Sequence, residues 1–373
     1  MWCESMKKGD LITLLISVSL CFLITELVLR KYNHFPLGLL SNTIAHSKLG
    51  YVMDTALPGI DSDGFRNPSL VQPDVITIGD SHTYGFNVLS EQSWPKVLAE
   101  KLDKEVYNYG VGGYGVLHYE YLINEAVGLN PEVILLGLYL PNDLADVCAL
   151  ALSSPYWFNE RVDLKIDRDI CNEYQSKKKL ARLSRANQSK SWLRENVALY
   201  STLLDWLARF SPLVSDKEGL VVGHGKTKIK YRKIRKHEEN MNIEHPHIKM
   251  SLDVLKLFML RANKLASLNS VNFAVLFIPS KERVYYDQLL TQNTFISKEY
   301  HRLVQNEDKL KLEMSAFMDN IGLLHADVLP SMQSALDSSL PLYSPIDDSH
   351  PVELGYQIYA NKAYELYQRV AEN

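Results

Sequence analysis

Residues 74–86 have the sequence "DVITIGDSHTYGF", in which a short apolar run stops abruptly at an acid, a hydroxyl and an imidazole. The run at 75–78 predicts a buried strand, because β-branched residues suit a pleated surface that is covered on both faces. Asp80, Ser81 and His82 follow at once. Either this is an ordinary strand-to-helix turn in which Ser81 caps the helix, or the chain presents a reactive group there.

The strand at 75–78 begins a regular alternation of strands and helices. Because continuous apolar runs are typical of strands covered on both faces, this alternation predicts an α/β domain with a parallel sheet. Further strands are predicted at 105–109, 133–140, 272–279 and 323–325, and helices at 94–102, at 114–127, around 252–266 and from Pro351.

The composition is that of a globular protein. The chain has 373 residues, of which 46% are hydrophobic and 23% charged, so it can bury one sizeable core with room for an insertion. Its net charge of −4 gives no electrostatic reason to expect a nucleic-acid partner.

The N-terminal segment at 11–29, "LITLLISVSLCFLITELVL", contains Glu26 as its only charged residue. At about 1.5 Å per residue, a helix of this length spans roughly 28 Å, close to the thickness of the hydrocarbon core of a bilayer. We therefore expect residues 1–31 to be a membrane anchor, with a cleaved signal peptide or a buried helix as alternatives. Short N-terminal tails usually stay in the cytoplasm, so the large domain is expected outside it, periplasmic or at the cell surface.

The remainder divides into a connector at 32–72 and one domain at 73–373, interrupted by an insertion at about 144–248. The insertion contains an amphipathic helical pattern around 193–207 and a basic stretch, "KTKIKYRKIRK", at 226–236. That stretch is expected to be a solvated loop, and a contact to anionic polysaccharide or lipid headgroups is the alternative. Cys148 and Cys171 could form a disulfide, or they could be two unrelated buried thiols.

Three polar clusters follow predicted strands and a fourth precedes the last predicted helix, all at the edge where open α/β sheets collect reactive groups. A hydroxyl, a glycine-rich turn, an amide and an Asp-x-x-His in that order mean more together than any one of them alone. The clusters are Gly79-Asp80-Ser81, "NYGVGG" at 108–113, "PND" at 141–143 and "DDSH" at 347–350.

These four clusters resemble the sequence blocks of the SGNH, or GDSL-like, hydrolase superfamily. "GDSHTYG" is similar to the nucleophile block, with His82 where many members have leucine, and the other clusters match the glycine, asparagine and histidine blocks. The N-terminal apolar helix and "DSDGFRNP" at 61–68 also resemble membrane-anchored bacterial members. The resemblance implies a three-layer αβα fold around a parallel sheet, flavodoxin-like, with serine esterase or acyl-transfer activity.

The chemistry of the matched residues fits that activity. Ser81 is a weak nucleophile that needs a base, His350 can supply it, and Asp347 can orient the imidazole. Asp348 is the alternative orienting acid. The resemblance assigns the oxyanion hole to the backbone N–H groups of Ser81 and Gly113 and the side-chain amide of Asn142. Gly110 or Gly112 could replace Gly113 as the donor.

The expected function is hydrolysis of O-acyl esters, above all O-acetyl esters, of cell-envelope or other carbohydrate substrates. An O-acyltransferase with the same triad and a non-catalytic SGNH scaffold that only binds are the alternatives. No metal or organic cofactor is expected. Asp80 and His82 also form an Asp-x-His after a strand, but a metal-dependent phosphoesterase needs further ligands that the sequence does not offer. The expected partners are an acylated small molecule or polysaccharide and the membrane.

Overall fold

The computed structural model describes residues 17–25, 42–67, 72–183, 219–345 and 348–372. The chain divides into two compact units, one formed by residues 1–42 and 179–215 and the other by residues 43–178 and 216–373. All the residues of the candidate site lie in the second unit.

In the first unit the structure describes a helix at 17–25, within the expected anchor. Among the described residues, no helix is both long enough and apolar enough to cross a bilayer. The rest of the apolar segment and the helix expected around 193–207 lie outside the described residues.

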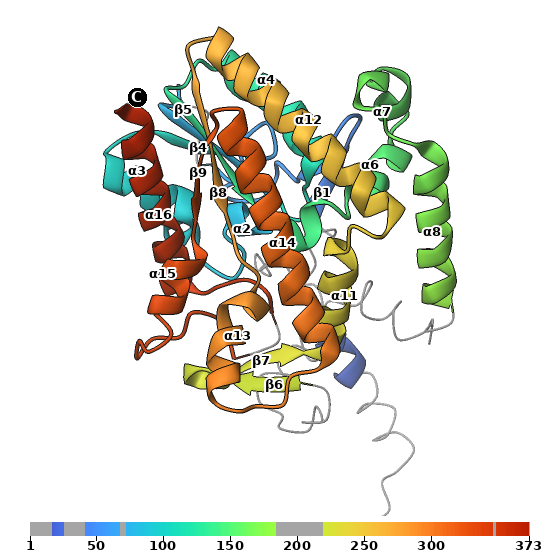
Figure 1. Cartoon of the computed structure of the whole chain (residues 1–373), viewed down its shortest axis with the longest axis vertical. Helices are drawn as coiled ribbons and strands as arrows, with labels where there is room; N and C mark the ends of the chain where they lie inside the picture. Colours follow the sequence, from blue (N-terminus) through green and yellow to red (C-terminus); the bar gives the residue numbers. More distant parts are fainter. Residues whose placement is uncertain (1–16, 26–41, 68–71, 184–218, 346–347, 373) are drawn as a thin grey trace, which may run out of the picture. The chain divides into compact units, whose positions relative to one another are not determined.

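A parallel sheet of five strands forms the centre of the second unit (Figure 1). Its strand order is β4-β3-β5-β8-β9, and every neighbouring pair is parallel. The expected α/β fold with a parallel sheet is therefore confirmed. The strands are β3 (Val75–Gly79), β4 (Val106–Asn108), β5 (Val133–Leu138), β8 (Asn272–Phe277) and β9 (Leu324–Asp327).

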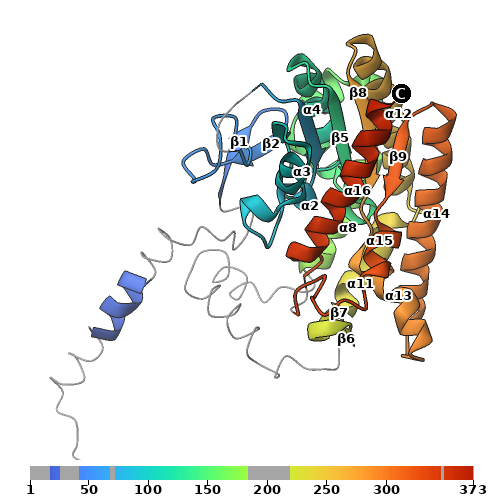
Figure 2. The ribbon, with the colours of Figure 1, turned by 90° about the vertical axis from the view of Figure 1, so that its left-hand side faces the viewer.

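Helices cover both faces of this sheet (Figure 2). On one face α4 packs against α12, and α14 packs against α12 and β9; on the other, α3 and α16 pack against each other and against the sheet. These helices are α3 (Trp94–Leu102), α4 (Val116–Gly128), α12 (Pro246–Leu268), α14 (Lys298–Asn320) and α16 (Glu353–Ala371).

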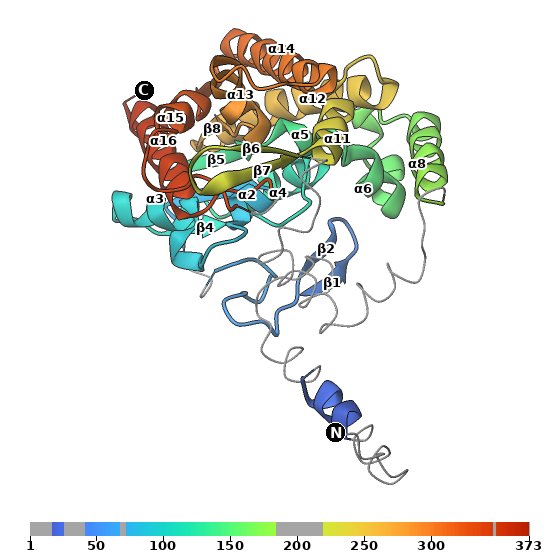
Figure 3. The same cartoon turned by 90° about the horizontal axis from the view of Figure 1, so that it is seen from below.

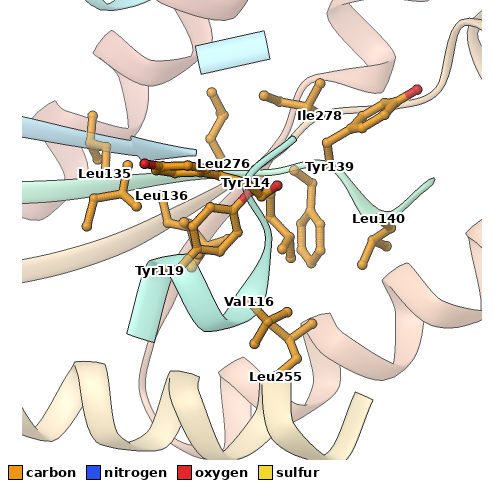
Figure 4. Close-up of a cluster of buried hydrophobic side chains, with 14 of the residues drawn as sticks. Tyr114, Val116, Tyr119, Leu135, Leu136, Tyr139, Leu140, Leu255, Leu276 and Ile278 are labelled. Atoms are coloured by element: carbon orange, nitrogen blue, oxygen red, sulfur yellow. Dashed lines mark hydrogen bonds between the residues drawn. The ribbon is translucent and has the colours of Figure 1, made fainter. Parts of the chain in front are cut away.

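The main core fills the space between the sheet and the α4–α12 layer (Figure 4). Leu136 of β5, Val116 of α4 and Leu255 of α12 are fully buried there, and Tyr119 adds a large aromatic ring. Burying each such side chain contributes about 1.5–3 kcal/mol, so this layer fixes the position of β5 and of the segment that follows it.

The segment expected to be a connector is folded in its second half. β1 (Thr43–His46) and β2 (Gly50–Met53) form an antiparallel hairpin, and Leu49 and Met53 are only 1% exposed. Arg66 donates to the backbone carbonyls of Tyr84 and Gly85, just after the candidate nucleophile. Residues 43–67 are thus part of the domain.

The described parts of the insertion contain helices and a two-stranded sheet. The insertion contains α6 and α8, and further along β7 and α11 cover the basic stretch, in which Ile234 is fully buried. That stretch is therefore not a solvated loop. Its described elements are α6 (Val147–Ser153), α7 (Tyr156–Asn159), α8 (Arg168–Leu183), β6 (Gly219–Val222), β7 (Thr227–Lys230) and α11 (Tyr231–Met241). The remaining helices are α2 (Ser81–Tyr84), α5 (Leu140–Asp143), α13 (Lys281–Thr291) and α15 (Leu329–Ser334).

A disulfide joins Cys148 of α6 to Cys171 of α8. Of the two possibilities that the sequence left open for these cysteines, the structure has the paired one. Because the bridge closes a loop of 23 residues, replacing both cysteines by serine should lower the stability by about 2–4 kcal/mol. Thermal unfolding of the full-length protein should show a lower Tm for the double variant and no change for Cys21→Ser, an exposed free cysteine. An unchanged Tm of the double variant would contradict the pairing.

Candidate active site

The site lies where the topology of the sheet reverses. From β3 the chain goes to β4 on one side and then returns to β5 on the other, so the carboxyl ends of β3 and β5 lie next to each other at the point where the strand order reverses. Seen from below, α2, α5 and the β6–β7 hairpin gather at this end of the sheet (Figure 3). Side chains that follow β3 and β5 are therefore brought together.

Ser81 is the first residue of α2, directly after the turn that ends β3. Asp80 caps this short helix, because its side chain accepts the N–H of His82 at 2.8 Å. A Cβ at Gly79 would lie 2.1 Å from the hydroxyl oxygen of Thr83, so glycine at this position lets Thr83 of α2 pack against the end of the strand. Ser81 is 6% exposed and lies at the end of the strand.

His350 reaches Ser81 from the far end of the chain. Its Nε2 lies 2.7 Å from Ser81 Oγ, across 269 residues of sequence. Its Nδ1 lies 2.5 Å from Oδ1 of Asp348, and the same oxygen accepts the backbone N–H of His350 at 2.9 Å. When Nδ1 carries the proton and donates it to the carboxylate, Nε2 is free to accept the Ser81 hydroxyl proton.

The acid beside His350 is Asp348, the alternative to Asp347. Asp347 was expected to orient the imidazole, but it lies outside the described residues, and Asp348 makes the contact. Burial by itself opposes the charge on Asp348, but the hydrogen bond and charge of His350 and the nearby Lys233 hold its pKa well below the usual value. Asp348 is therefore ionised throughout the neutral range.

A buried lysine holds the backbone of this acid. Lys281 is completely buried, and its ammonium donates to the backbone carbonyl of Asp348 at 2.5 Å and to that of Lys228 at 2.7 Å. Lys228 belongs to β7, so Lys281 links the insertion to the segment that carries Asp348 and His350. This role could not be predicted from the sequence, because lysine is expected on the surface.

Asn142 and Ser81 both contact the side-chain carboxylate of Asp80. Its amide nitrogen is 2.9 Å from Oδ2 of Asp80, and the same oxygen is 3.4 Å from Ser81 Oγ. Burial raises the pKa of Asp80, while the hydrogen bonds from Asn142 and the His82 N–H lower it. The amide of Asn142 thus lies within the same polar cluster as the Ser81 hydroxyl.

The glycine-rich loop after β4 packs against α2, which carries Ser81, and against α5, which carries Asn142. A Cβ at Gly110 would lie 2.4 Å from the backbone nitrogen of Tyr84 in α2, and one at Gly115 would lie 2.8 Å from the carbonyl oxygen of Asp143 in α5. The N–H of Gly110 donates to the side chain of Asn108, so it is engaged within the loop. No described hydrogen bond takes the N–H of Gly113, which has a left-handed backbone with φ of 82°.

His82 lies under the imidazole of His350 and is fully buried. Its ring centroid is 4.9 Å from that of His350 and 4.1 Å from that of Tyr139. Burial and the charge of His350 hold the pKa of His82 well below its usual value, so this ring is neutral. Both nitrogens of His350 are already engaged by Ser81 and Asp348, which leaves His82 as a packing neighbour of this hydrogen-bonded chain.

A buried carboxyl behind the site should make stability depend on pH. Glu307 accepts the backbone N–H of Ser280 at 2.8 Å and contacts its hydroxyl, and burial raises the pKa of Glu307 to about 7. The folded state therefore favours the protonated acid. Because the carboxyl has a pKa of 4.5 in the unfolded chain, the free energy of unfolding should fall by about 3 kcal/mol as the pH rises from about 4.5 to above 7.

Glu307→Gln should remove most of this loss, because the amide does not titrate. Urea unfolding of the full-length protein at pH 5 and pH 8 measures the difference, with Glu372→Gln at the exposed end of α16 as the control. Parallel pH profiles for the wild type and Glu307→Gln would contradict the assignment.

The described residues contain no group of three or more His, Cys, Asp or Glu arranged to hold a metal ion. The polar groups around Ser81 instead form the hydrogen-bonded chain Ser81–His350–Asp348. Such a chain can transfer a proton from a hydroxyl and stabilise the positive imidazole that results.

Comparisons with known proteins give structural neighbours only. No protein-family model and no curated protein matches the chain. Solved structures similar to it include a lipolytic protein of the G-D-S-L family from Desulfitobacterium hafniense, with 13% identity over 78% of this chain and 98% of that chain and a TM-score of 0.38. A protein described as an acylhydrolase from Bacteroides fragilis has 12% identity over 85% and 93%, with a TM-score of 0.36. A GDSL-like lipase from Bacteroides thetaiotaomicron has 10% identity over 80% and 92%, with a TM-score of 0.36. At these TM-scores the likenesses carry no argument, and the function is argued from the residues of this chain.

Proposed function

We propose that this protein is a serine acyl hydrolase that cleaves O-acyl esters through Ser81, His350 and Asp348. The observation that carries the proposal is the 2.7 Å contact between Ser81 Oγ and His350 Nε2, with Asp348 on the opposite nitrogen of the same ring. A nucleophile, a base and an orienting acid in this order are what acyl transfer through a covalent intermediate requires.

In the first half of the reaction, Ser81 Oγ attacks the ester carbonyl while His350 Nε2 takes the hydroxyl proton. The carbonyl oxygen becomes an oxyanion, for which the N–H groups of Ser81 and Gly113 and the amide of Asn142 are the proposed donors. The ester C–O bond then breaks, and His350 returns the proton to the departing alkoxide. The acyl group remains on Ser81.

In the second half, an acceptor hydroxyl attacks the acyl-enzyme and gives its proton to His350, which passes it to Ser81 Oγ as that bond breaks. Water as the acceptor releases a carboxylic acid, and a sugar hydroxyl gives a new ester. We propose O-acetyl esters of carbohydrates as the substrate class, which the resemblance to SGNH hydrolases supports. O-acetyl transfer to a sugar is the alternative with the same residues.

We also propose that the domain lies outside the cytoplasm, held by a membrane anchor within 1–31. The disulfide between Cys148 and Cys171 supports this, because disulfides persist in oxidising compartments. In intact spheroplasts an added protease should cleave the domain of the membrane-bound protein. Cleavage only after lysis would place the domain in the cytoplasm instead.

The activity is tested on the full-length protein in detergent, with p-nitrophenyl acetate and an O-acetylated oligosaccharide, in the presence and absence of a sugar acceptor. Mass spectrometry of rapidly quenched samples should find an acetyl group on the peptide that contains Ser81, and a fluorophosphonate should label the same residue. Acetate release supports hydrolysis, and acetylated acceptor supports transfer. A folded protein that neither turns over these esters nor reacts at Ser81 would be a binding scaffold.

A further inference from the structure

Tyr51, from the N-terminal hairpin, contacts the glycine-rich loop next to the candidate oxyanion donor. Its hydroxyl donates to the carbonyl oxygen of Gly112 at 2.7 Å. The strand that carries Tyr51 is itself held, because the hydroxyl of Tyr114 donates to the Tyr51 carbonyl at 2.7 Å. Burial raises the pKa of the Tyr51 phenol, so the group remains a donor at any physiological pH.

The hydrogen bond from Tyr51 to the carbonyl of Gly112 also fixes the direction of the neighbouring N–H group. The carbonyl of Gly112 and the N–H of Gly113 belong to the same peptide unit, which is planar, and the described chain contains no cis peptide bond. In a trans unit the two groups point in opposite directions. A phenol that holds the carbonyl of Gly112 therefore directs the N–H of Gly113 away from Tyr51, and this N–H has no described acceptor.

The Tyr51 hydroxyl also leaves no room for a side chain at position 113. A Cβ at Gly113 would lie 2.6 Å from the hydroxyl oxygen of Tyr51, closer than real Cβ contacts come, and the next Tyr51 atom would be 3.9 Å away. The positive φ of Gly113, 82°, disfavours a side chain as well. The hydroxyl oxygen is therefore the one Tyr51 atom that a side chain at position 113 would approach too closely.

We propose that Tyr51 is a positioning residue that aims the Gly113 N–H at the oxyanion formed on the substrate of Ser81. The proposal rests on the proposed function and adds to it a residue from outside the four sequence clusters. An oxyanion donor acts because it is fixed in place before charge develops, so a donor that is free to tilt loses part of its effect. A hydrogen bond to the carbonyl also polarises the N–H of the same unit, which strengthens it as a donor.

The first test is Tyr51→Phe, which removes the hydroxyl and leaves the ring. Losing an oxyanion donor outright costs about 100- to 1,000-fold in kcat, so a donor that is merely released should cost about 10- to 100-fold. KM should stay within about twofold, because the ground-state carbonyl carries no developed charge. Tyr156→Phe is the matched control, since this half-buried tyrosine lies in α7 and belongs to neither the triad nor the glycine-rich loop.

Wild-type kcat in Tyr51→Phe, with the ester turned over normally, would overturn the positioning role and leave the proposed function intact. Equal losses in kcat for Tyr51→Phe and Tyr156→Phe would also overturn it, because both would then reflect general loosening. A wild-type protein without any turnover would instead count against the proposed function itself.

The second test measures the contact between Tyr51 and Gly113 by thermal unfolding, and it does not require enzymatic activity. Gly113→Ala should lower the Tm strongly in the wild type, because the new methyl group meets the Tyr51 hydroxyl. In Tyr51→Phe that oxygen is gone, so adding Gly113→Ala should cost less than half as many degrees, leaving mainly the strain of the positive φ. An equal Tm loss in both backgrounds would show that Tyr51 does not press on Gly113, and would overturn the inference.

Discussion

Ser81→Ala should lower kcat for acetyl esters by about 10⁴- to 10⁶-fold, with the fold and the Tm preserved. The reason is that alanine removes the only atom able to form the acyl-enzyme, while the imidazole and the proposed oxyanion donors remain. The residual rate would come from water attacking an ester that those donors still polarise. The measurement is steady-state turnover of p-nitrophenyl acetate by the full-length protein, together with circular dichroism of each variant.

Ser334→Ala is the matched control for this change. Ser334 is in α15, and its hydroxyl donates to the carbonyl of Pro330 within that helix. Turnover by Ser334→Ala should equal that of the wild type. If Ser81→Ala keeps more than about a tenth of the wild-type rate, the hydrolysis does not pass through this serine.

Much of the sheet could be predicted because each strand carries its own local signal. The run at 75–78 is buried on both faces in the structure, and the helix expected at 94–102 has those bounds in α3. The proximity of Ser81 and Asn142 could be predicted in the same way, since polar residues after parallel strands meet at one edge of the sheet. The pairing of Ser81 with His350, which are 269 residues apart, is instead what the resemblance to SGNH hydrolases implies.

The parts that could not be predicted depend on tertiary contacts without a local pattern. The hairpin that carries Tyr51 has four-residue strands, partly exposed on β1, so neither periodicity nor a long apolar run marks it. Lys281 contradicts the expectation that lysine is exposed, because its partners include two backbone carbonyls that only folding brings together. Short-range sequence rules do not contain this information.

The sequence also could not decide which of two neighbouring residues, Asp347 or Asp348, orients His350. Asp347 and Asp348 have the same chemistry, and a spacing rule borrowed from a family selects the first of them. In the structure the backbone N–H of His350 donates to Asp348 Oδ1 at 2.9 Å, a local turn that brings this carboxylate to the imidazole. Such a turn is a property of the backbone conformation, which spacing in sequence does not specify.

Asp348→Asn should therefore lower kcat by about 10³- to 10⁴-fold, whereas Asp347→Asn should change it by less than about tenfold. The amide at position 348 lacks the charge that stabilises the protonated imidazole. It can also turn an N–H toward Nδ1 of His350, which would force the proton onto Nε2, and a protonated Nε2 cannot accept the hydroxyl proton of Ser81. The two variants make the same chemical change one residue apart, so each is the control for the other. Steady-state kinetics at a fixed pH, with the Tm of both variants measured, decides between them: a larger loss in Asp347→Asn would move the orienting role back to that residue.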